Sequence, residues 1–319
     1  MHKTGGPEVM EYVEVEVGAP GPGEAQVRQA AIGLNFIDVY FRTGLYPQPL
    51  PGALGMEGAG VVEAVGEGVT EVQVGDRVAY AGRPNGAYAE VRNMPSAILL
   101  KLPDAISFET GAAMMLQGLT VQYLFNRTVK LKVEATRSCS MPPRAVSGLI
   151  ACQWAKAIGV NMIGTVGSEE KAALARAHGC AHVINYNTEN FVERVREITN
   201  GEKVSVVYDS IGKDTFIGSL DCLRPLGMMV SFGSASGPVP DFSLSELASR
   251  GSLFITRPAL FSYASNRAAL EEMAADLFQM VASGKVRIDV HQRYKLAYVA
   301  QAHIELEARK TIGSSVLIP

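Results

Sequence analysis

Several features that mark particular protein classes are scarce in this sequence. Its 319 residues contain 4 cysteines (Cys139, Cys152, Cys180 and Cys222), with no Cys-x-x-Cys pair. This spacing argues against a disulfide framework and favours a reducing compartment. No apolar run approaches the roughly 20 residues that cross a bilayer, and the N-terminus lacks the apolar core of a signal peptide. The sequence therefore predicts a cytoplasmic protein without a membrane partner.

Charge of one sign is not in excess either. The net charge is −3, and the lysines and arginines are dispersed rather than gathered in a stripe. Because nucleic-acid binding needs a basic surface, this distribution argues against a nucleic-acid partner. Hydrophobic residues make up 47% of the chain and charged residues 19%, which is typical of a globular protein. The length indicates two domains.

The two parts of the chain carry different patterns. Val13–Val17 alternates between apolar and acidic residues, and Val61–Val65 and Arg77–Tyr80 are short apolar runs bounded by glycines. Such runs predict a compact, barrel-like domain of short strands. A helix is predicted from Ser107 to Leu124, and from Ile150 onwards predicted strands and helices alternate. This alternation indicates a doubly wound parallel sheet, so the fold class is α/β.

Several motifs resemble the zinc-independent quinone oxidoreductase (zeta-crystallin-like) branch of the medium-chain dehydrogenase/reductase superfamily. They are Gly33-Leu34-Asn35-Phe36-Ile37-Asp38, Gly44-Leu45-Tyr46-Pro47, Gly55-Met56-Glu57-Gly58-Ala59-Gly60, Leu116-Gln117-Gly118-Leu119-Thr120-Val121-Gln122-Tyr123 and Gly313-Ser314-Ser315. The resemblance implies a GroES-like catalytic domain in residues 1–105 and 286–319. It implies a Rossmann nucleotide-binding domain in residues 106–285. It also implies a homodimer, formed through the edge of the second domain near residues 252–256.

The sequence departs from the zinc alcohol dehydrogenases at the metal ligands. Those enzymes have a cysteine and a histidine where this chain has Asn35 and Met56, and neither side chain replaces a thiolate or an imidazole at tetrahedral zinc. We therefore expect no metal. Alcohol oxidation through a metal alkoxide is then disfavoured, whereas a quinone accepts hydride without such help.

The residues after Gly164-Thr165-Val166 indicate NADPH rather than NADH. An NAD site usually has an acidic residue at this point, which binds the ribose hydroxyls. This chain has Ser168 and then Lys171, which suit a 2′-phosphate, although Glu169 and Glu170 count against it. Ser168 also fits the N-cap of a helix. By resemblance, further residues line the cofactor: Asn35, Tyr123, Gly148, Tyr186, Ser210, Phe232, Gly233 and Arg309.

The expected glycine-rich phosphate loop is missing from residues 134–147. Met141-Pro142-Pro143 removes backbone donors there and predicts a disturbed first Rossmann strand. Back-translated with permitted codons and read in another frame, this stretch gives Gly-Asp-Thr-Val-Leu-Phe-His-Ala-Ala-Ala-Gly-Gly-Val, followed by Gly148. We therefore hypothesise a local frameshift. The alternative is a divergent loop in which Arg144 supplies charge. The chain also begins near Gly5-Gly6-Pro7 without the family's first strand, which favours a longer natural N-terminus.

The catalytic candidates are Asn35, Asp38 and Tyr46. Tyr46 either orients the quinone oxygen and passes it a proton or packs as a loop tyrosine. Asp38 serves acid–base chemistry or, as the preferred interpretation, holds Tyr40 or a helix turn. The predicted function is NADPH-dependent quinone reduction by hydride transfer without a metal. The alternatives are reduction of enone or alkenal double bonds and a catalytically impaired nucleotide-binding homologue.

Overall fold

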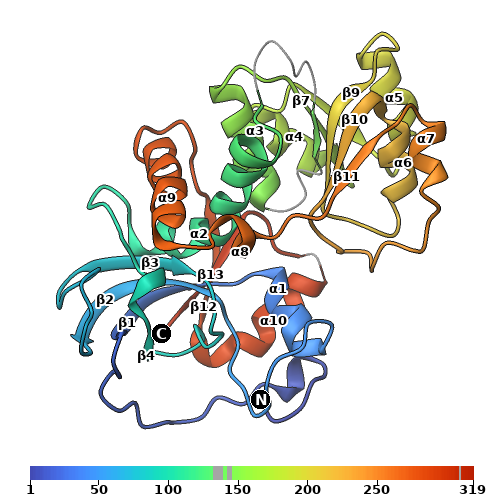
Figure 1. Cartoon of the computed structure of the whole chain (residues 1–319). Helices are drawn as coiled ribbons and strands as arrows, with labels where there is room; N and C mark the ends of the chain where they lie inside the picture. Colours follow the sequence, from blue (N-terminus) through green and yellow to red (C-terminus); the bar gives the residue numbers. More distant parts are fainter. Residues whose placement is uncertain (132–138, 142–145, 309) are drawn as a thin grey trace. The chain divides into compact units, whose positions relative to one another are not determined.

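The computed structural model describes residues 1–131, 139–141, 146–308 and 310–319. These residues form two compact units (Figure 1). The GroES-like unit comprises Met1–Leu119, Ala264–Ala282 and Ile288–Pro319, and the Rossmann unit comprises Thr120–Tyr263 and Ser283–Arg287. Both ends of the chain therefore belong to the GroES-like unit, as the resemblance implies.

A seven-stranded sheet forms the body of the GroES-like unit. The strand order is β12-β13-β1-β2-β3-β5, with β4 also paired to β1, and only β12 and β13 run parallel to each other. Alternate residues point into a core that includes Val27, Val62, Val78 and Leu317. The strands are β1 (Glu24–Gly33), β2 (Glu57–Val65), β3 (Arg77–Ala81), β4 (Val91–Pro95), β5 (Leu100–Lys101), β12 (Val290–Lys295) and β13 (Ser314–Ile318).

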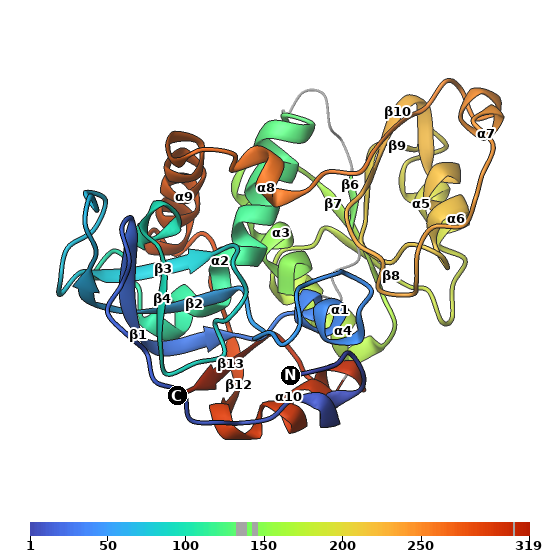
Figure 2. The same ribbon diagram turned by 60° about the horizontal axis from the view of Figure 1, so that its bottom comes forward.

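Helices α1 (Phe36–Thr43) and α10 (Val299–Glu307) lie side by side in this unit (Figures 1 and 2). Arg42 of α1 donates two hydrogen bonds of 2.8 Å to Glu307 of α10. Helix α1 ends at Gly44, whose φ of 85° is a left-handed conformation that glycine adopts without strain. The two helices are thus joined, near the end of α1, by an ion pair in which one guanidinium nitrogen contacts both carboxylate oxygens.

Helix α9 (Arg267–Ala282) also belongs to the GroES-like unit. Leu277 packs so closely on Gly118 of α2 (Phe108–Tyr123) that a Cβ at Gly118 would lie 2.5 Å from it. Arg267 donates to the carbonyl of Leu99. The boundaries predicted from the sequence grouped α9 with the other domain, and these contacts explain the difference.

The Rossmann unit contains a six-stranded parallel sheet in the order β11-β10-β9-β6-β7-β8. This is the doubly wound sheet that the alternating sequence pattern predicts. The strand order reverses between β6 and β9, where such sheets bind dinucleotides. The strands are β6 (Cys139–Met141), β7 (Met162–Val166), β8 (His182–Asn185), β9 (Val204–Asp209), β10 (Leu223–Ser231) and β11 (Phe254–Thr256). The helices are α3 (Val146–Ala157), α4 (Glu169–Ala177), α5 (Phe191–Ile198), α6 (Phe216–Asp221), α7 (Ser245–Ser249) and α8 (Leu260–Tyr263).

The segment predicted to be disturbed supplies the central strand. Cys139–Met141 pairs with Met162 to Gly164 on one side and with Val206 and Val207 on the other. Its backbone thus takes the place expected of the first Rossmann strand. Residues 134–138 and 142–145, including Arg144, lie outside the described residues.

The prediction of a strand at Val13–Val17 is wrong. This segment forms no regular element, and Val13 and Val15 are 61% and 71% exposed. A strand requires a neighbour for its backbone hydrogen bonds, and the alternation of side chains does not supply one. Among the described helices, none combines the length and the apolar character needed to cross a bilayer.

Candidate active site

Two of the three residues predicted for catalysis, Asn35 and Asp38, lie at the N-terminus of α1, just after β1. Asn35 is the N-cap, and its backbone N–H donates to Asp38 Oδ2 at 3.0 Å as part of a capping box. Asn35 is 4% exposed and Asp38 is fully buried. Asp38 therefore holds the first turn of α1, as the preferred interpretation of the sequence has it.

Glu57 is a buried acid that the sequence analysis did not select. Asn35 Nδ2 donates to Glu57 Oε2 at 2.6 Å, and the backbone N–H of Leu116 donates to Glu57 Oε1 at 2.8 Å. Gln117 Nε2 donates to Asn35 Oδ1 at 3.1 Å. The Asn35 amide is thus held at both ends. The available signal was Glu57 itself, an acidic residue in the apolar, glycine-rich stretch Gly55–Gly60.

Burial governs the ionisation of both carboxyl groups. It raises the pKa of Asp38 to about 7 and the pKa of Glu57 to about 8, because lost hydration outweighs the hydrogen bonds that each group accepts. The charge of Asp38 raises the pKa of Glu57 further. Among the described residues, Asp38 Oδ1 has no hydrogen-bond partner. Near neutral pH this site therefore contains two carboxyl groups that can hold a proton.

Tyr46 belongs to a group of aromatic rings beside α1. Its ring packs edge-on against Tyr40 and Phe41, with centroids 5.2 Å and 5.7 Å away, and Tyr40 packs edge-on against Phe36. The backbone N–H of Tyr46 donates to the carbonyl of Tyr40 at 3.0 Å. Phe41 is buried, whereas Phe36, Tyr40 and Tyr46 are at least partly exposed and are rings that a flat acceptor can stack on. A role of Tyr46 in proton transfer stays a prediction.

In the Rossmann unit, three predicted cofactor residues meet at the carboxyl ends of β7 and β8. Ser168 is the N-cap of α4, and its Oγ accepts the backbone N–H of Lys171 at 3.3 Å. Tyr186 donates its backbone N–H to Val166, and a Cβ at Gly167 would lie 2.6 Å from the Tyr186 hydroxyl oxygen. A helix N-terminus with a hydroxyl and a lysine in its first turn suits a phosphate group.

A second group of predicted cofactor residues lies where β9 and β10 end. Asp209, 2% exposed, accepts the backbone N–H groups of Ile211 and Gly212 at 2.7 Å and 3.0 Å, which fixes the turn that contains Ser210. A Cβ at Gly233 would lie only 2.4 Å from the Ser210 carbonyl oxygen. Ser210, Phe232 and Gly233 are thus neighbours, and a side chain in place of Gly233 would separate the two turns.

Arg257, just beyond β11, holds this second group in place. Its NH1 donates to Ser231 Oγ at 3.1 Å and to the Gly233 carbonyl at 2.7 Å, and its NH2 donates to Ser234 Oγ at 3.2 Å. Arg257 thus fixes the backbone around Gly233.

The remaining cofactor candidates have separate positions. Tyr123, at the end of α2, stacks on Tyr263 with centroids 4.6 Å apart, and burial raises its pKa well above the usual value. Gly148 lies buried in the first turn of α3. Arg309 lies outside the described residues. Apart from Asn35 and Arg309, all cofactor candidates belong to the Rossmann unit.

Comparison with known proteins identifies the family. Residues 21–104 match the alcohol dehydrogenase GroES-like domain, and residues 147–277 match the domain described as zinc-binding dehydrogenase. A quinone oxidoreductase of Pseudomonas aeruginosa is 54% identical over 316 residues, which cover 99% of this chain and 97% of that protein. The chain belongs to the quinone oxidoreductase branch of the medium-chain dehydrogenase/reductase superfamily.

Two further relatives of this quinone oxidoreductase branch are informative. The crystal structure of Escherichia coli quinone oxidoreductase complexed with NADPH has a TM-score of 0.97 and 50% identity, and the match covers 100% of this chain and 98% of that one. A 2-haloacrylate reductase of a Burkholderia species is 46% identical, covering 100% of this chain and 98% of that protein. Relatives named for two substrate classes therefore match over essentially the whole chain.

For this member of the branch, the raised carboxyl pKa values predict a loss of stability as pH rises. Both groups ionise near pH 4 when unfolded, but in the folded protein Asp38 keeps its proton to about pH 7 and Glu57 to about pH 8. The folded state therefore binds more protons than the unfolded state in this interval. The unfolding free energy should fall with rising pH, by at most about 1.4 kcal/mol per unit for each group.

Urea unfolding measured at a series of pH values between about 6 and 8 tests this dependence. Glu57→Gln is the matched variant, because the amide oxygen still accepts a hydrogen bond but the group no longer titrates. We expect the unfolding free energy to fall less steeply with pH in Glu57→Gln than in the parent. The difference between the two slopes should be larger toward the acid end of this range. Identical slopes in the two proteins would show that Glu57 is ionised throughout.

Removing the Arg257 side chain should weaken cofactor binding without unfolding the protein. Arg257→Ala deletes the donors that fix Gly233, so we expect the KM for NADPH to rise about tenfold, the effect of losing one or two charged hydrogen bonds. Arg224→Ala, which removes an exposed arginine from β10, is the control and should leave KM unchanged. An equal KM in both variants would contradict this role of Arg257.

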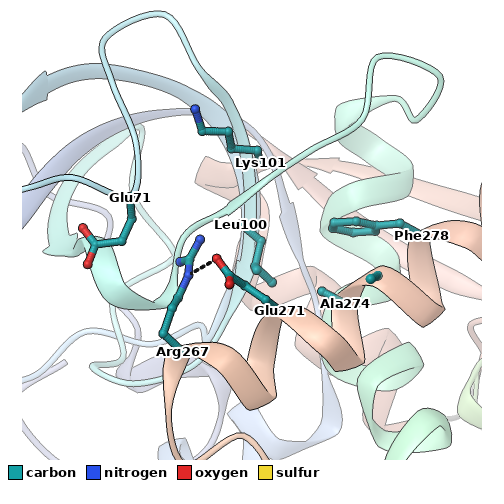
Figure 3. Close-up of a pocket in the computed structure, with 8 residues that line it drawn as sticks. Glu71, Leu100, Lys101, Arg267, Glu271, Ala274 and Phe278 are labelled. Carbon is teal, nitrogen blue, oxygen red and sulfur yellow. Dashed lines mark hydrogen bonds and ion pairs between the residues drawn. The ribbon is translucent and has the colours of Figure 1, made fainter.

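A hollow between β5 and α9 lies elsewhere in the GroES-like unit (Figure 3). Leu100, Ala274 and Phe278 line its apolar part, and Arg267 Nε is paired with Glu271 Oε1 at 2.6 Å on its rim. It contains none of the residues predicted for catalysis or cofactor binding. We therefore place the candidate active site at α1 and not in this hollow.

Proposed function

We propose that this protein reduces quinones with hydride from NADPH and that it does so without a catalytic metal ion. The observation that carries the proposal is the match, over the whole chain and at 50% identity, to a quinone oxidoreductase complexed with NADPH. When bound, NADPH supplies the hydride. The protein's own residues then have to hold the nucleotide, orient the acceptor and supply a proton.

The residues at the carboxyl edge of the Rossmann sheet fit NADPH. Val166 at the end of β7 is followed by Gly167 and Ser168 rather than by an acidic residue, although Glu169 and Glu170 follow in the first turn of α4. Ser168 and Lys171 supply a hydroxyl and a cation in the first turn of α4. Tyr186, Ser210, Phe232 and Gly233 would hold the rest of the dinucleotide, and Tyr123, Gly148 and Arg309 are proposed by resemblance.

The side chains at the former metal positions support metal-free chemistry. The Asn35 amide is occupied by Glu57 and Gln117, and Met56 is fully buried in a cluster with Phe41 and Leu54. A neutral amide and a thioether are weak ligands for zinc compared with thiolate and imidazole. The donor set therefore does not favour a zinc ion that would polarise a substrate oxygen.

The catalytic assignment rests on three residues near α1. We propose that Asn35 orients the reacting groups, that Tyr46 contacts the acceptor ring, and that Asp38 acts mainly by holding Asn35. Reduction of a quinone by hydride leaves a hydroquinone anion that needs one proton. Glu57, whose pKa of about 8 keeps it protonated at neutral pH, is a proton reservoir joined to Asn35 by hydrogen bonding.

Carbon–carbon double-bond reduction is the second candidate function, because a 2-haloacrylate reductase is 46% identical over the whole chain. Steady-state NADPH oxidation with a panel of benzoquinone, naphthoquinone, enone and 2-haloacrylate acceptors separates the two. We expect the highest kcat/KM with quinones. Higher values with enones or haloacrylates would favour the second candidate. Tight NADPH binding without oxidation by any acceptor would favour an impaired nucleotide-binding protein.

We also propose a cytoplasmic homodimer. Strand β11 forms one edge of the Rossmann sheet, and Phe254 on it is 55% exposed. An exposed edge strand is a natural template for pairing with the same strand of a second copy. Light scattering of the purified protein should give twice the mass of one chain, 34.1 kDa, and a monomer at micromolar concentration would contradict this proposal.

A further inference from the structure

A row of polar side chains, three of them buried, leads away from Asp38 through the GroES-like unit. Tyr88 OH lies 2.9 Å from Asp38 Oδ2 and 3.0 Å from His303 Nε2. His303 Nδ1 lies 3.1 Å from Arg42 NH1, and Arg42 NH2 makes both 2.8 Å contacts with the Glu307 carboxylate. Asp38, His303 and Arg42 are at most 1% exposed. We call these five residues the Asp38–Glu307 row.

The direction of every hydrogen bond in the row follows from Arg42. A guanidinium group only donates, so His303 Nδ1 must be the acceptor and the imidazole proton must sit on Nε2. That proton is donated to the Tyr88 oxygen, so the Tyr88 hydroxyl donates to Asp38. Burial and the neighbouring Arg42 charge lower the pKa of His303 to about 3, which agrees with a neutral ring. Between Arg42 and Asp38, every donor therefore points toward Asp38, whereas Arg42 NH2 donates the other way, to Glu307.

The direction of these hydrogen bonds excludes a proton relay along the row and favours a role in holding Asp38 in place. A guanidinium does not release its proton at physiological pH, so the row does not carry protons from Glu307 to Asp38. Its effect ends at Asp38 Oδ2, which also accepts the backbone N–H of Asn35 at 3.0 Å. The row thus fixes the carboxyl group that fixes the N-cap of α1.

Stability alone does not require the row. Arg42 and His303 lose their hydration in the folded state, and apolar residues of similar volume often replace buried ion pairs without loss of stability. Polar groups in such surroundings give a single geometry instead. The geometry that they fix here is that of Asn35, whose amide is held between Glu57 and Gln117.

We propose that Tyr88, His303, Arg42 and Glu307 are positioning residues for hydride transfer, acting through Asp38 on Asn35. The inference rests on the proposed function only in its kinetic part. The charged or titratable groups around Asp38 are Glu57, Arg42, Tyr88 and neutral His303. Of these, only Glu57 also titrates near neutral pH, and it is unchanged in the variants below.

Tyr88→Phe tests the row because it removes a donor to Asp38 and keeps the aromatic ring. In cofactor-free protein labelled with ¹³C-aspartate, the Asp38 carboxyl should titrate at a higher pH than in the parent, since the Tyr88 hydroxyl favours its ionised form. With NADPH and benzoquinone, kcat should fall about tenfold while the KM for benzoquinone stays the same.

Tyr294→Phe is the matched control. Its hydroxyl donates to the Glu305 carboxylate at 2.5 Å in the same unit but outside the row. This variant should leave both the Asp38 titration and kcat unchanged. If Tyr88→Phe also leaves them unchanged, or if Tyr294→Phe changes them equally, the proposal is overturned.

Glu307→Gln provides a second variant at the partly exposed end of the row, for the case that Tyr88→Phe does not fold. It removes the negative charge opposite Arg42 and should lower kcat about threefold. It should also change the pH at which the Asp38 carboxyl titrates. An unchanged kcat and titration would contradict the proposal. If the parent protein does not oxidise NADPH with benzoquinone, the proposed function fails. The titration of Asp38 in the variants then tests by itself whether the row positions this carboxyl group.

Discussion

Replacing Lys171 with glutamate is expected to raise the KM for NADPH about a hundredfold and to leave the KM for NADH nearly unchanged. Lys171 lies in the first turn of α4, and the N-cap of this helix, Ser168, follows the end of β7 after Gly167. A charge-assisted hydrogen bond to phosphate contributes roughly 1.5–3 kcal/mol, and reversing the charge adds repulsion. Steady-state kinetics with each nucleotide measures the change.

Lys295→Glu is the control for this experiment. It makes the same charge change at an exposed position of β12, so it reports the effect of net charge alone and should leave both KM values near those of the parent. If Lys171→Glu raises the KM for NADH as much as the KM for NADPH, Lys171 does not recognise the 2′-phosphate. The preference for NADPH would then have another source.

Replacing residues 135–147 with the 13-residue peptide of the alternative reading frame is expected to tighten NADPH binding by at least about tenfold. The peptide Gly-Asp-Thr-Val-Leu-Phe-His-Ala-Ala-Ala-Gly-Gly-Val restores glycines and backbone N–H groups before Gly148. Each N–H that reaches a phosphate contributes on the order of 1–2 kcal/mol. Titration of NADPH fluorescence with each protein gives the two dissociation constants.

The gene itself provides the companion test. Resequencing codons 134–147 should reveal the displaced frame if the stretch results from a sequencing error. An unshifted reading of Met141-Pro142-Pro143, together with equally tight NADPH binding by the two proteins, would contradict the frameshift hypothesis. It would favour the divergent loop, in which Arg144 supplies the charge for the phosphates.

Local signals predicted most of the Rossmann unit. Ser168 and Asn190 cap α4 and α5 through their side-chain oxygens, so the starts of these helices are encoded within a few residues. The parallel strands are apolar runs bounded by such helices. At Val13–Val17 the same kind of reasoning failed, because alternation describes a half-buried strand only when another strand lies beside it.

The active-site geometry was less accessible from the sequence. Asn35, Asp38 and Tyr46 came from motifs within one short segment. The Asp38–Glu307 row joins α1 to Tyr88 and to α10, and no local pattern relates positions that are far apart in the chain. Glu57 was present in a quoted motif, but its importance depends on burial, which the fold determines.

The reaction itself is the most direct test of metal-free quinone reduction by NADPH. The purified protein, dialysed against a strong chelator, is mixed anaerobically with NADPH and 1,4-benzoquinone, and both NADPH loss and hydroquinone formation are measured. We predict one hydroquinone per NADPH, at a rate that the chelator does not change and that NADH does not match. Bound NADPH that is not oxidised, or activity that disappears on chelation and returns with zinc, would contradict it.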